Sequence, residues 1–95
     1  MSASDVIRET RNLLFERGWT QYGSVDPDGS MCVLGALTTV ARTADRSSVE
    51  AAAAAVFEAV GQGCTSVTSW NDESGRTFSE VVEMLDRAEK VADAS

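Results

Sequence analysis

Apolar side chains recur every three or four positions in four stretches of the chain, and this spacing predicts four amphipathic helices. The stretches cover residues 4–17, 32–42, about 48–60 and 77–92. The stripes expected to be buried consist of Val6, Ile7, Thr10, Leu13 and Leu14; Val33, Leu34, Leu37, Val40 and Ala41; Val49, Ala53, Val56, Phe57 and Val60; and Phe78, Val81, Val82, Leu85 and Ala88. Because each helix must bury its stripe, we expect the four helices to pack against one another.

Local capping signals predict several of the helix ends. Ser4 is the expected N-cap of the first helix, and Gly18 stands where a left-handed C-cap glycine would end it. Thr77 and Glu80 fit a capping box, in which each side chain bonds the backbone N–H of the other residue. The last helix is therefore expected to begin at this pair.

The segment between the first two predicted helices has the signature of a turn. Residues 25–30 read Val-Asp-Pro-Asp-Gly-Ser, in which proline presets φ at the first corner and glycine accepts a left-handed exit. The flanks, 22–25 and 30–32, are expected to pair as a short hairpin packed on the helices. Residues 64–69 fit either a strand or one helical turn. We therefore expect residues 1–95 to form a single domain: a mainly α, compact bundle of about four helices with a short β-hairpin between helices one and two.

Charge and composition exclude several classes of function. The chain of 95 residues carries 15 acidic and 8 basic side chains, which gives a net charge of −7. This charge argues against binding to nucleic acid or to anionic membranes, since both require a basic surface. No apolar run approaches the length of a membrane span, and no secretory signal is visible. We expect the protein in the cytoplasm.

The absence of histidine removes most of the usual catalytic chemistry. Ser–His and Cys–His nucleophiles, histidine general bases and histidine-ligated metals are all excluded. Cys32 and Cys64 do not suffice for a structural zinc site with four ligands. Asp72 and Glu73 are adjacent carboxylates of the kind that are usually solvated in loops. The sequence predicts a non-enzymatic protein with no catalytic residue, no metal site and no cofactor.

The most distinctive cluster of side chains lies at residues 70–77, which read Trp-Asn-Asp-Glu-Ser-Gly-Arg-Thr. One interpretation is structural: Asn71 and Asp72 bond their own backbone, and Trp70 covers the core. In this interpretation Arg76 pairs with a neighbouring carboxylate. The other interpretation is a recognition loop, in which Trp70 stacks on a ligand or partner and the amide and carboxylate supply polar contacts. The sequence leaves both open.

A second candidate group surrounds Trp19. Its residues either pack against the last helix or the hairpin, or they place Trp19 opposite Trp70 on the walls of one groove that holds a base, a nucleotide or a partner side chain. The candidate binding residues are Trp19, Gln21, Tyr22, Trp70, Asn71, Asp72 and Arg76. Cys32 is expected to be a small buried residue at a helix start, with a thiolate stabilised by the helix N-terminus and Arg76 as the alternative.

Three patches of sequence carry a family resemblance. They are Gly18-Trp19-Thr20-Gln21, then Cys32-Val33-Leu34-Gly35-Ala36-Leu37, then Trp70-Asn71-Asp72 with Gly75-Arg76-Thr77 and Glu80-Val81. In their order and spacing, these patches resemble a family of small uncharacterised proteins from actinobacteria and their bacteriophages. The resemblance covers most of the chain and implies no activity.

Three functions follow as hypotheses. The first is an interaction protein that binds and modulates a host or phage protein, in the host cytoplasm if the gene belongs to a phage, through the surface of Trp19 and Trp70. The second is a module that sequesters a small ligand, a nucleotide or metabolite, between the tryptophans, with Arg76 and the N-terminus of the last helix facing a phosphate. The third is an enzyme based on carboxylates or thiols. All three are compatible with a homodimer, since a short chain gains core by association.

Overall fold

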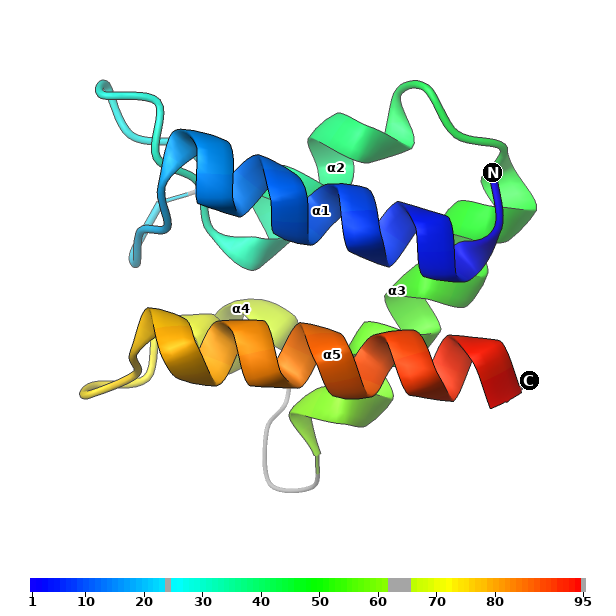
Figure 1. The fold of residues 1–95 in the computed structure, drawn as a ribbon. Helices are drawn as coiled ribbons and strands as arrows, with labels where there is room; N and C mark the ends of the chain where they lie inside the picture. Colours follow the sequence, from blue (N-terminus) through cyan, green and yellow to red (C-terminus); the bar gives the residue numbers. More distant parts are fainter. Residues whose placement is uncertain (24, 62–65, 95) are drawn as a thin grey trace.

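The computed structural model describes residues 1–23, 25–61 and 66–94, and these ranges contain five helices. The helices are α1 (Ala3–Arg17), α2 (Val33–Ala41), α3 (Arg46–Val60), α4 (Val67–Asn71) and α5 (Phe78–Ala94). In Figure 1, α1 and α5 lie side by side and run in opposite directions, and α3 contacts both of them. The mainly α fold is confirmed. The number of four helices is wrong, because the short helix α4 occupies part of the segment that the sequence left undecided.

The first helix begins at Ala3, one residue before the predicted stretch, and its N-cap lies two residues before the predicted Ser4. Ser2 is the N-cap: its hydroxyl accepts the N–H of Asp5 at 3.2 Å, and the Asp5 carboxylate accepts the N–H of Ser2 at 3.0 Å. Ser4 was the wrong choice because the residue three positions after it, Ile7, cannot complete such a reciprocal pair. Gly18 ends α1 as expected, with φ 93° and its N–H on the Leu14 carbonyl, although its ψ of 154° is not that of a left-handed cap.

The other long helices follow the same capping logic. Asp45 caps α3, which therefore starts before the predicted residue, Ser48, and the Asp45 carboxylate accepts the Ser48 N–H at 3.1 Å. Hydrogen bonds from the two following serines lower the pKa of Asp45 to about 2. At the start of α5 the capping box is confirmed: Thr77 N–H donates to Glu80 Oε1 at 2.9 Å, and the Glu80 N–H donates to Thr77 Oγ1 at 3.3 Å.

The predicted β-hairpin does not form in the described residues. The turn itself is confirmed, since the Gly29 N–H donates to the Asp26 carbonyl at 2.9 Å. Its return arm, however, is divided between two partners: Met31 forms a parallel bridge with Trp19 and an antiparallel bridge with Val25. The Met31 N–H donates to the carbonyl of Gly18, and the Met31 carbonyl accepts the N–H of Thr20. Met31 therefore bonds the segment just after α1, and its backbone groups do not extend a hairpin ladder with residues 22–25.

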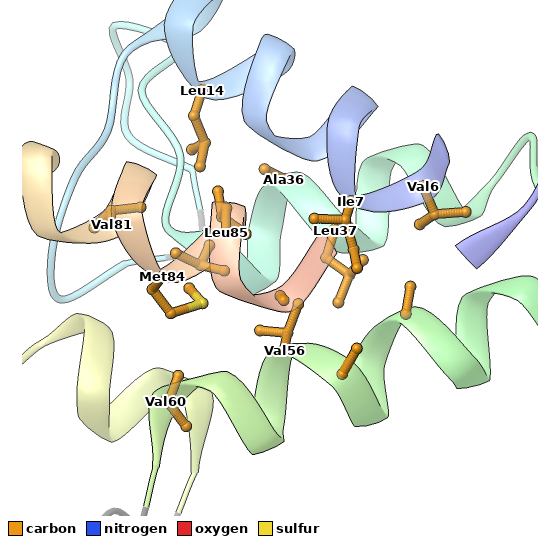
Figure 2. Packing of buried hydrophobic residues seen from close by; sticks show 14 of the residues in the cluster. Val6, Ile7, Leu14, Ala36, Leu37, Val56, Val60, Val81, Met84 and Leu85 are labelled. Atoms are coloured by element: carbon orange, nitrogen blue, oxygen red, sulfur yellow. The ribbon is translucent and has the colours of Figure 1, made fainter. Parts of the chain in front are cut away.

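The hydrophobic core lies where α1, α2, α3 and α5 meet (Figure 2). Its fully buried members are Val6, Ile7, Leu14, Val33, Ala36, Ala52, Val56, Val81, Met84, Leu85 and Ala88. Two predicted core residues are wrong: Leu34 is 42% and Phe57 is 52% exposed. In α3 the buried face is centred on alanines and Val56, and a rotation of about 100° per residue turns Phe57 away from it. Met84 belongs to the core although it was absent from the predicted stripe.

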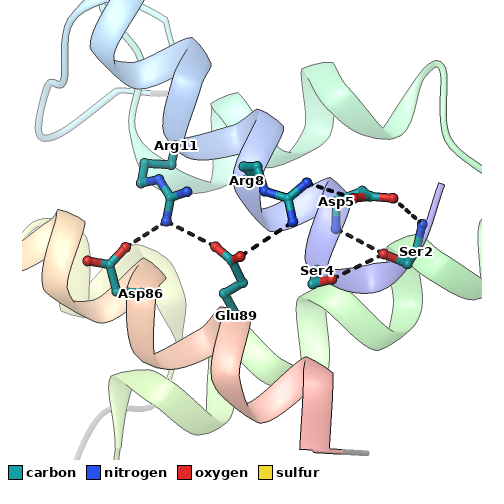
Figure 3. Close-up of polar contacts among 7 residues, drawn as sticks. All are labelled: Ser2, Ser4, Asp5, Arg8, Arg11, Asp86 and Glu89. Atoms are coloured by element: carbon teal, nitrogen blue, oxygen red, sulfur yellow. Dashed lines mark hydrogen bonds and ion pairs between the residues drawn. The ribbon is translucent and has the colours of Figure 1, made fainter.

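The seam between α1 and α5 has a charged outer edge (Figure 3). Arg11 on α1 pairs with Asp86 at 2.6 Å and with Glu89 at 3.1 Å on α5, and Arg8 reaches Glu89 at 3.5 Å. Arg8 also pairs with Asp5 at 2.8 Å within α1. These contacts link α1 to α5 along the edge at which the two helices lie side by side.

Candidate functional site

Asn71, the last residue of α4, is the centre of a buried polar network. Its Oδ1 accepts the Trp19 indole N–H at 2.7 Å and the Val33 backbone N–H at 3.1 Å. Its Nδ2 donates to the Thr20 carbonyl at 3.1 Å and to Asp72 Oδ1 at 2.9 Å. An amide has about four hydrogen-bonding positions, and all of them are used here. The side chain therefore joins the loop after α1, the start of α2 and the end of α4.

The loop after α1 is attached to the same place by two further residues. Gln21 Nε2 donates to the carbonyls of Asn71 and Glu73 at 3.0 and 2.9 Å. The backbone N–H of Tyr22 donates to Asp72 Oδ1 at 2.9 Å. Tyr22 has φ 66°, a left-handed conformation that is strained for a bulky residue, and its side chain is 73% exposed. The hydrogen bonds to α4 and its C-terminal turn hold the backbone in this conformation.

Trp70 and Arg76, on either side of the turn that follows Asn71, contact each other and form a second group of interactions. Trp70 is only 6% exposed, and the Arg76 guanidinium lies over its ring at 3.9 Å from the centroid. Arg76 Nε donates to the Trp70 carbonyl, and the terminal nitrogens pair with Glu73 at 2.6 Å and with Glu80 at 3.2 Å. A phosphate approaching this guanidinium would have to displace two carboxylates. Thr77 and Glu80 already cap the neighbouring N-terminus of α5.

Trp19 belongs to a row of three aromatic rings. Its ring stacks on Phe78 with centroids 6.3 Å apart, and Phe78 meets Phe15 edge to face at 5.2 Å. Phe15 is 60% exposed. A hollow of about 350 Å³ opens beside this row, lined by Phe15, Phe78, Ser79, Val82 and Glu83. We call Phe15, Phe78 and Trp19 the aromatic row.

The structure thus brings all seven predicted site residues into one region, but not in the predicted arrangement. Trp19, Gln21 and Asp72 are hydrogen-bonded to Asn71, Tyr22 is hydrogen-bonded to Asp72, and Arg76 covers Trp70. Trp70 has almost no free surface on which a ligand could stack. Phe15 was not among the predicted site residues. A large aromatic residue outside the apolar stripe of its helix is expected to be exposed, and this position in the sequence could have identified it.

Cys32 occupies the N-cap of α2, where its sulfur accepts the Gly35 N–H at 3.2 Å. It is buried, as expected, and lies on a pocket of about 180 Å³ together with Tyr22, Gly23, Thr68 and Asp72. The proposed thiolate partner, Arg76, is bonded to Trp70, Glu73 and Glu80. Cys64 lies outside the described residues. Within the described ranges, no three cysteine or carboxylate side chains are grouped as metal ligands.

The chain is a small all-α protein in which the polar network around Asn71 joins the loop after α1 to the short helices α2 and α4. The chain belongs to the DUF6197 family of unknown function, whose model matches residues 1–91. Comparison with curated proteins and with solved structures gave no match. Among the described residues, every helix is too short or too polar to cross a membrane.

Proposed function

We propose that this chain is a non-enzymatic interaction module that binds a partner protein through the aromatic row. The observation that carries the proposal is the exposure of Phe15, 60% of which faces solvent while its ring contacts Phe78 beside a hollow. Aromatic anchors next to a pocket supply much of the binding energy at protein interfaces. The proposed surface includes Trp19 but is shifted from Trp70 to Phe15 and Phe78.

The polar network supports this function indirectly. Asn71 holds Trp19 by the indole N–H, and Trp19 in turn stacks on Phe78. A recognition surface made of rings that are already fixed loses little conformational entropy when a partner binds. In this proposal the residues of the 70–77 block position the surface and do not contact the partner themselves.

We extend the proposal to the setting that the sequence resemblance suggests. The protein comes from an actinobacterium or one of its phages, acts in the cytoplasm, and modulates a host protein. The alternative, sequestration of a nucleotide or metabolite, has less support. Arg76 is engaged by Glu73 and Glu80, and Trp70 is buried. A thermal-shift screen in which a nucleotide raises the melting temperature would favour this alternative.

The test of the proposed function is capture of partners from an actinobacterial lysate on three baits. They are the wild type, Phe15→Ala and Phe57→Ala. Phe57 is the matched control, since it is 52% exposed but lies on α3. We expect a protein that is retained by the wild type and by Phe57→Ala and is lost with Phe15→Ala. Retention of the same proteins by all three baits would contradict the proposal.

A further inference from the structure

The outer face of α5 carries two hollows in line with each other. The first is the hollow of the aromatic row, and the second, of about 270 Å³, is lined by Asp86, Glu89, Lys90 and Asp93. The α5 residues of both recur at three- and four-residue spacing, which places them on one side of the helix. With a rise of 1.5 Å per residue, the two hollows are centred about 13 Å apart along α5. This face of α5 thus carries an apolar hollow near the start of the helix and a charged hollow nearer its end, and we call the two together the α5 groove.

The groove carries more negative than positive charge. Of its α5 residues, Glu83, Asp86, Glu89 and Asp93 are acidic and Lys90 is basic. Arg11 and Arg8 on α1 neutralise part of this charge through Asp86 and Glu89 (Figure 3). Glu83, on the wall of the apolar hollow, has no such ion pair among the described residues. A partner that carries a basic side chain next to the apolar residue in the hollow would form an ion pair with Glu83.

We propose that the α5 groove binds a short segment of a partner protein in which an aromatic or large aliphatic residue enters the apolar hollow, a neighbouring basic side chain pairs with Glu83, and further basic residues lie toward Asp93. This proposal rests on the proposed function and specifies the chemistry of the partner. A second copy of the chain is a poorer occupant, since it would bring a second molecule of charge −7 against the same carboxylates.

The experiment is selection of random linear peptides on the immobilised full chain, followed by affinity measurements with fluorescently labelled synthetic copies of the enriched peptides. The variants are Phe15→Ala, which removes the ring at the mouth of the hollow, and Ser79→Arg, which fills the hollow from an exposed position. Glu83→Lys reverses the charge on its wall, and Phe57→Ala is the control. Circular dichroism of each variant establishes that it is folded, and sedimentation of the wild type measures self-association.

We expect the enriched peptides to combine a large apolar residue with Lys or Arg. Phe15→Ala and Ser79→Arg should weaken binding about tenfold or more, as for a central anchor, whereas Phe57→Ala should leave it unchanged. Glu83→Lys should weaken binding of the basic peptides several-fold and strengthen that of copies in which the basic residue is replaced by Glu.

Each other result overturns a defined part of the proposal. Peptides that depend on Phe15 but lack basic residues, or that are indifferent to Glu83→Lys, overturn the partner chemistry and leave the proposed function intact. If the peptides bind Phe15→Ala and Ser79→Arg as tightly as the wild type, both the partner chemistry and the proposed function are overturned. The same holds if the wild type enriches no peptides beyond those enriched on Phe15→Ala. A dimer in sedimentation that Phe15→Ala abolishes makes the occupant a second copy, which also overturns the proposal.

Discussion

The indole N–H of Trp19 donates a 2.7 Å hydrogen bond to Oδ1 of Asn71, although the two residues are 52 positions apart. The bond joins the loop after α1 to the end of α4 inside the protein, where Asn71 is fully buried. The same oxygen accepts the backbone N–H of Val33, the first residue of α2. One amide therefore decides how three separate segments meet.

Replacing Asn71 by Ala should lower the free energy of unfolding by about 2–4 kcal/mol. The substitution leaves the buried N–H of Val33, the partly buried indole N–H of Trp19 and the partly buried carbonyl of Thr20 without their partner, and a buried unpaired polar group costs about 1–3 kcal/mol. Urea denaturation followed by circular dichroism measures the change. Asn12→Ala, an exposed Asn→Ala change within α1, controls for helix propensity. A loss below about 1 kcal/mol would mean that water replaces the amide.

Tyr22→Asn should stabilise the protein by roughly 0.5–1 kcal/mol. Tyr22 has φ 66°, and Asn tolerates the left-handed region better than a bulky side chain does. Little contact is lost, because the Tyr22 side chain is 73% exposed, and the backbone N–H remains free to donate to Asp72. Thermal and urea unfolding measure the change. Tyr22→Val should destabilise, since a branched side chain fits this conformation worst, and equal stability of the two variants would contradict the account.

Local signals made part of this fold predictable from the sequence. The Thr77–Glu80 capping box, the Pro-Asp-Gly turn and the glycine after α1 depend on residues a few positions apart, and the structure has each of them. The phase of the α3 stripe was harder, because a run of alanines permits a helix to bury either side. Phe57 was therefore assigned to the core although it faces solvent.

The candidate site was predictable in its members and not in its organisation. A Trp-Asn-Asp block before a helix fits a turn or a recognition loop equally well, because the partners of Asn71 lie about 40 to 50 positions earlier in the chain. Only the packing of α1 against α5 brings Phe15 beside Phe78. The burial of Trp70 and the exposure of Phe15 are therefore consequences of tertiary structure.

Arg11→Met should cost about 0.5–1 kcal/mol at low salt and less at high salt. Arg11 is 20% exposed and pairs with both Asp86 and Glu89, while the methionine retains most of the apolar stem. Added salt screens the ion pairs and should reduce the difference from the wild type. The control is Arg46→Met, whose ion pair with Glu50 has 93% and 68% exposed side chains, so its loss should be near zero. Urea midpoints at two salt concentrations measure both, and equal losses would refute a role for the α1–α5 seam.

The pH dependence of stability should include a contribution from Asp45 that Asp45→Asn removes. Hydrogen bonds from Ser47 and Ser48 lower the pKa of this carboxyl from 3.8 to about 2. A group whose pKa is lower in the folded state stabilises the protein above its unfolded pKa and loses that effect as the pH falls through its folded pKa. The wild type should therefore exceed Asp45→Asn in stability above about pH 4, and the difference should shrink as the pH falls and be mostly lost by about pH 2. Asparagine keeps an N-cap oxygen, so the helix still starts at the same place.

Urea midpoints of the two proteins, measured from pH 5 to pH 2, test this expectation. The pKa values of Asp5, Asp28 and Glu80 are also lowered by hydrogen bonds, so the stability of the wild type alone would report all four groups together. Since the variant retains those three carboxyls, their contributions cancel in the difference between the two proteins. A difference that stays constant over this range would show that Asp45 caps α3 equally well in its neutral form, and that the three hydrogen bonds to its carboxylate do not favour the charged state.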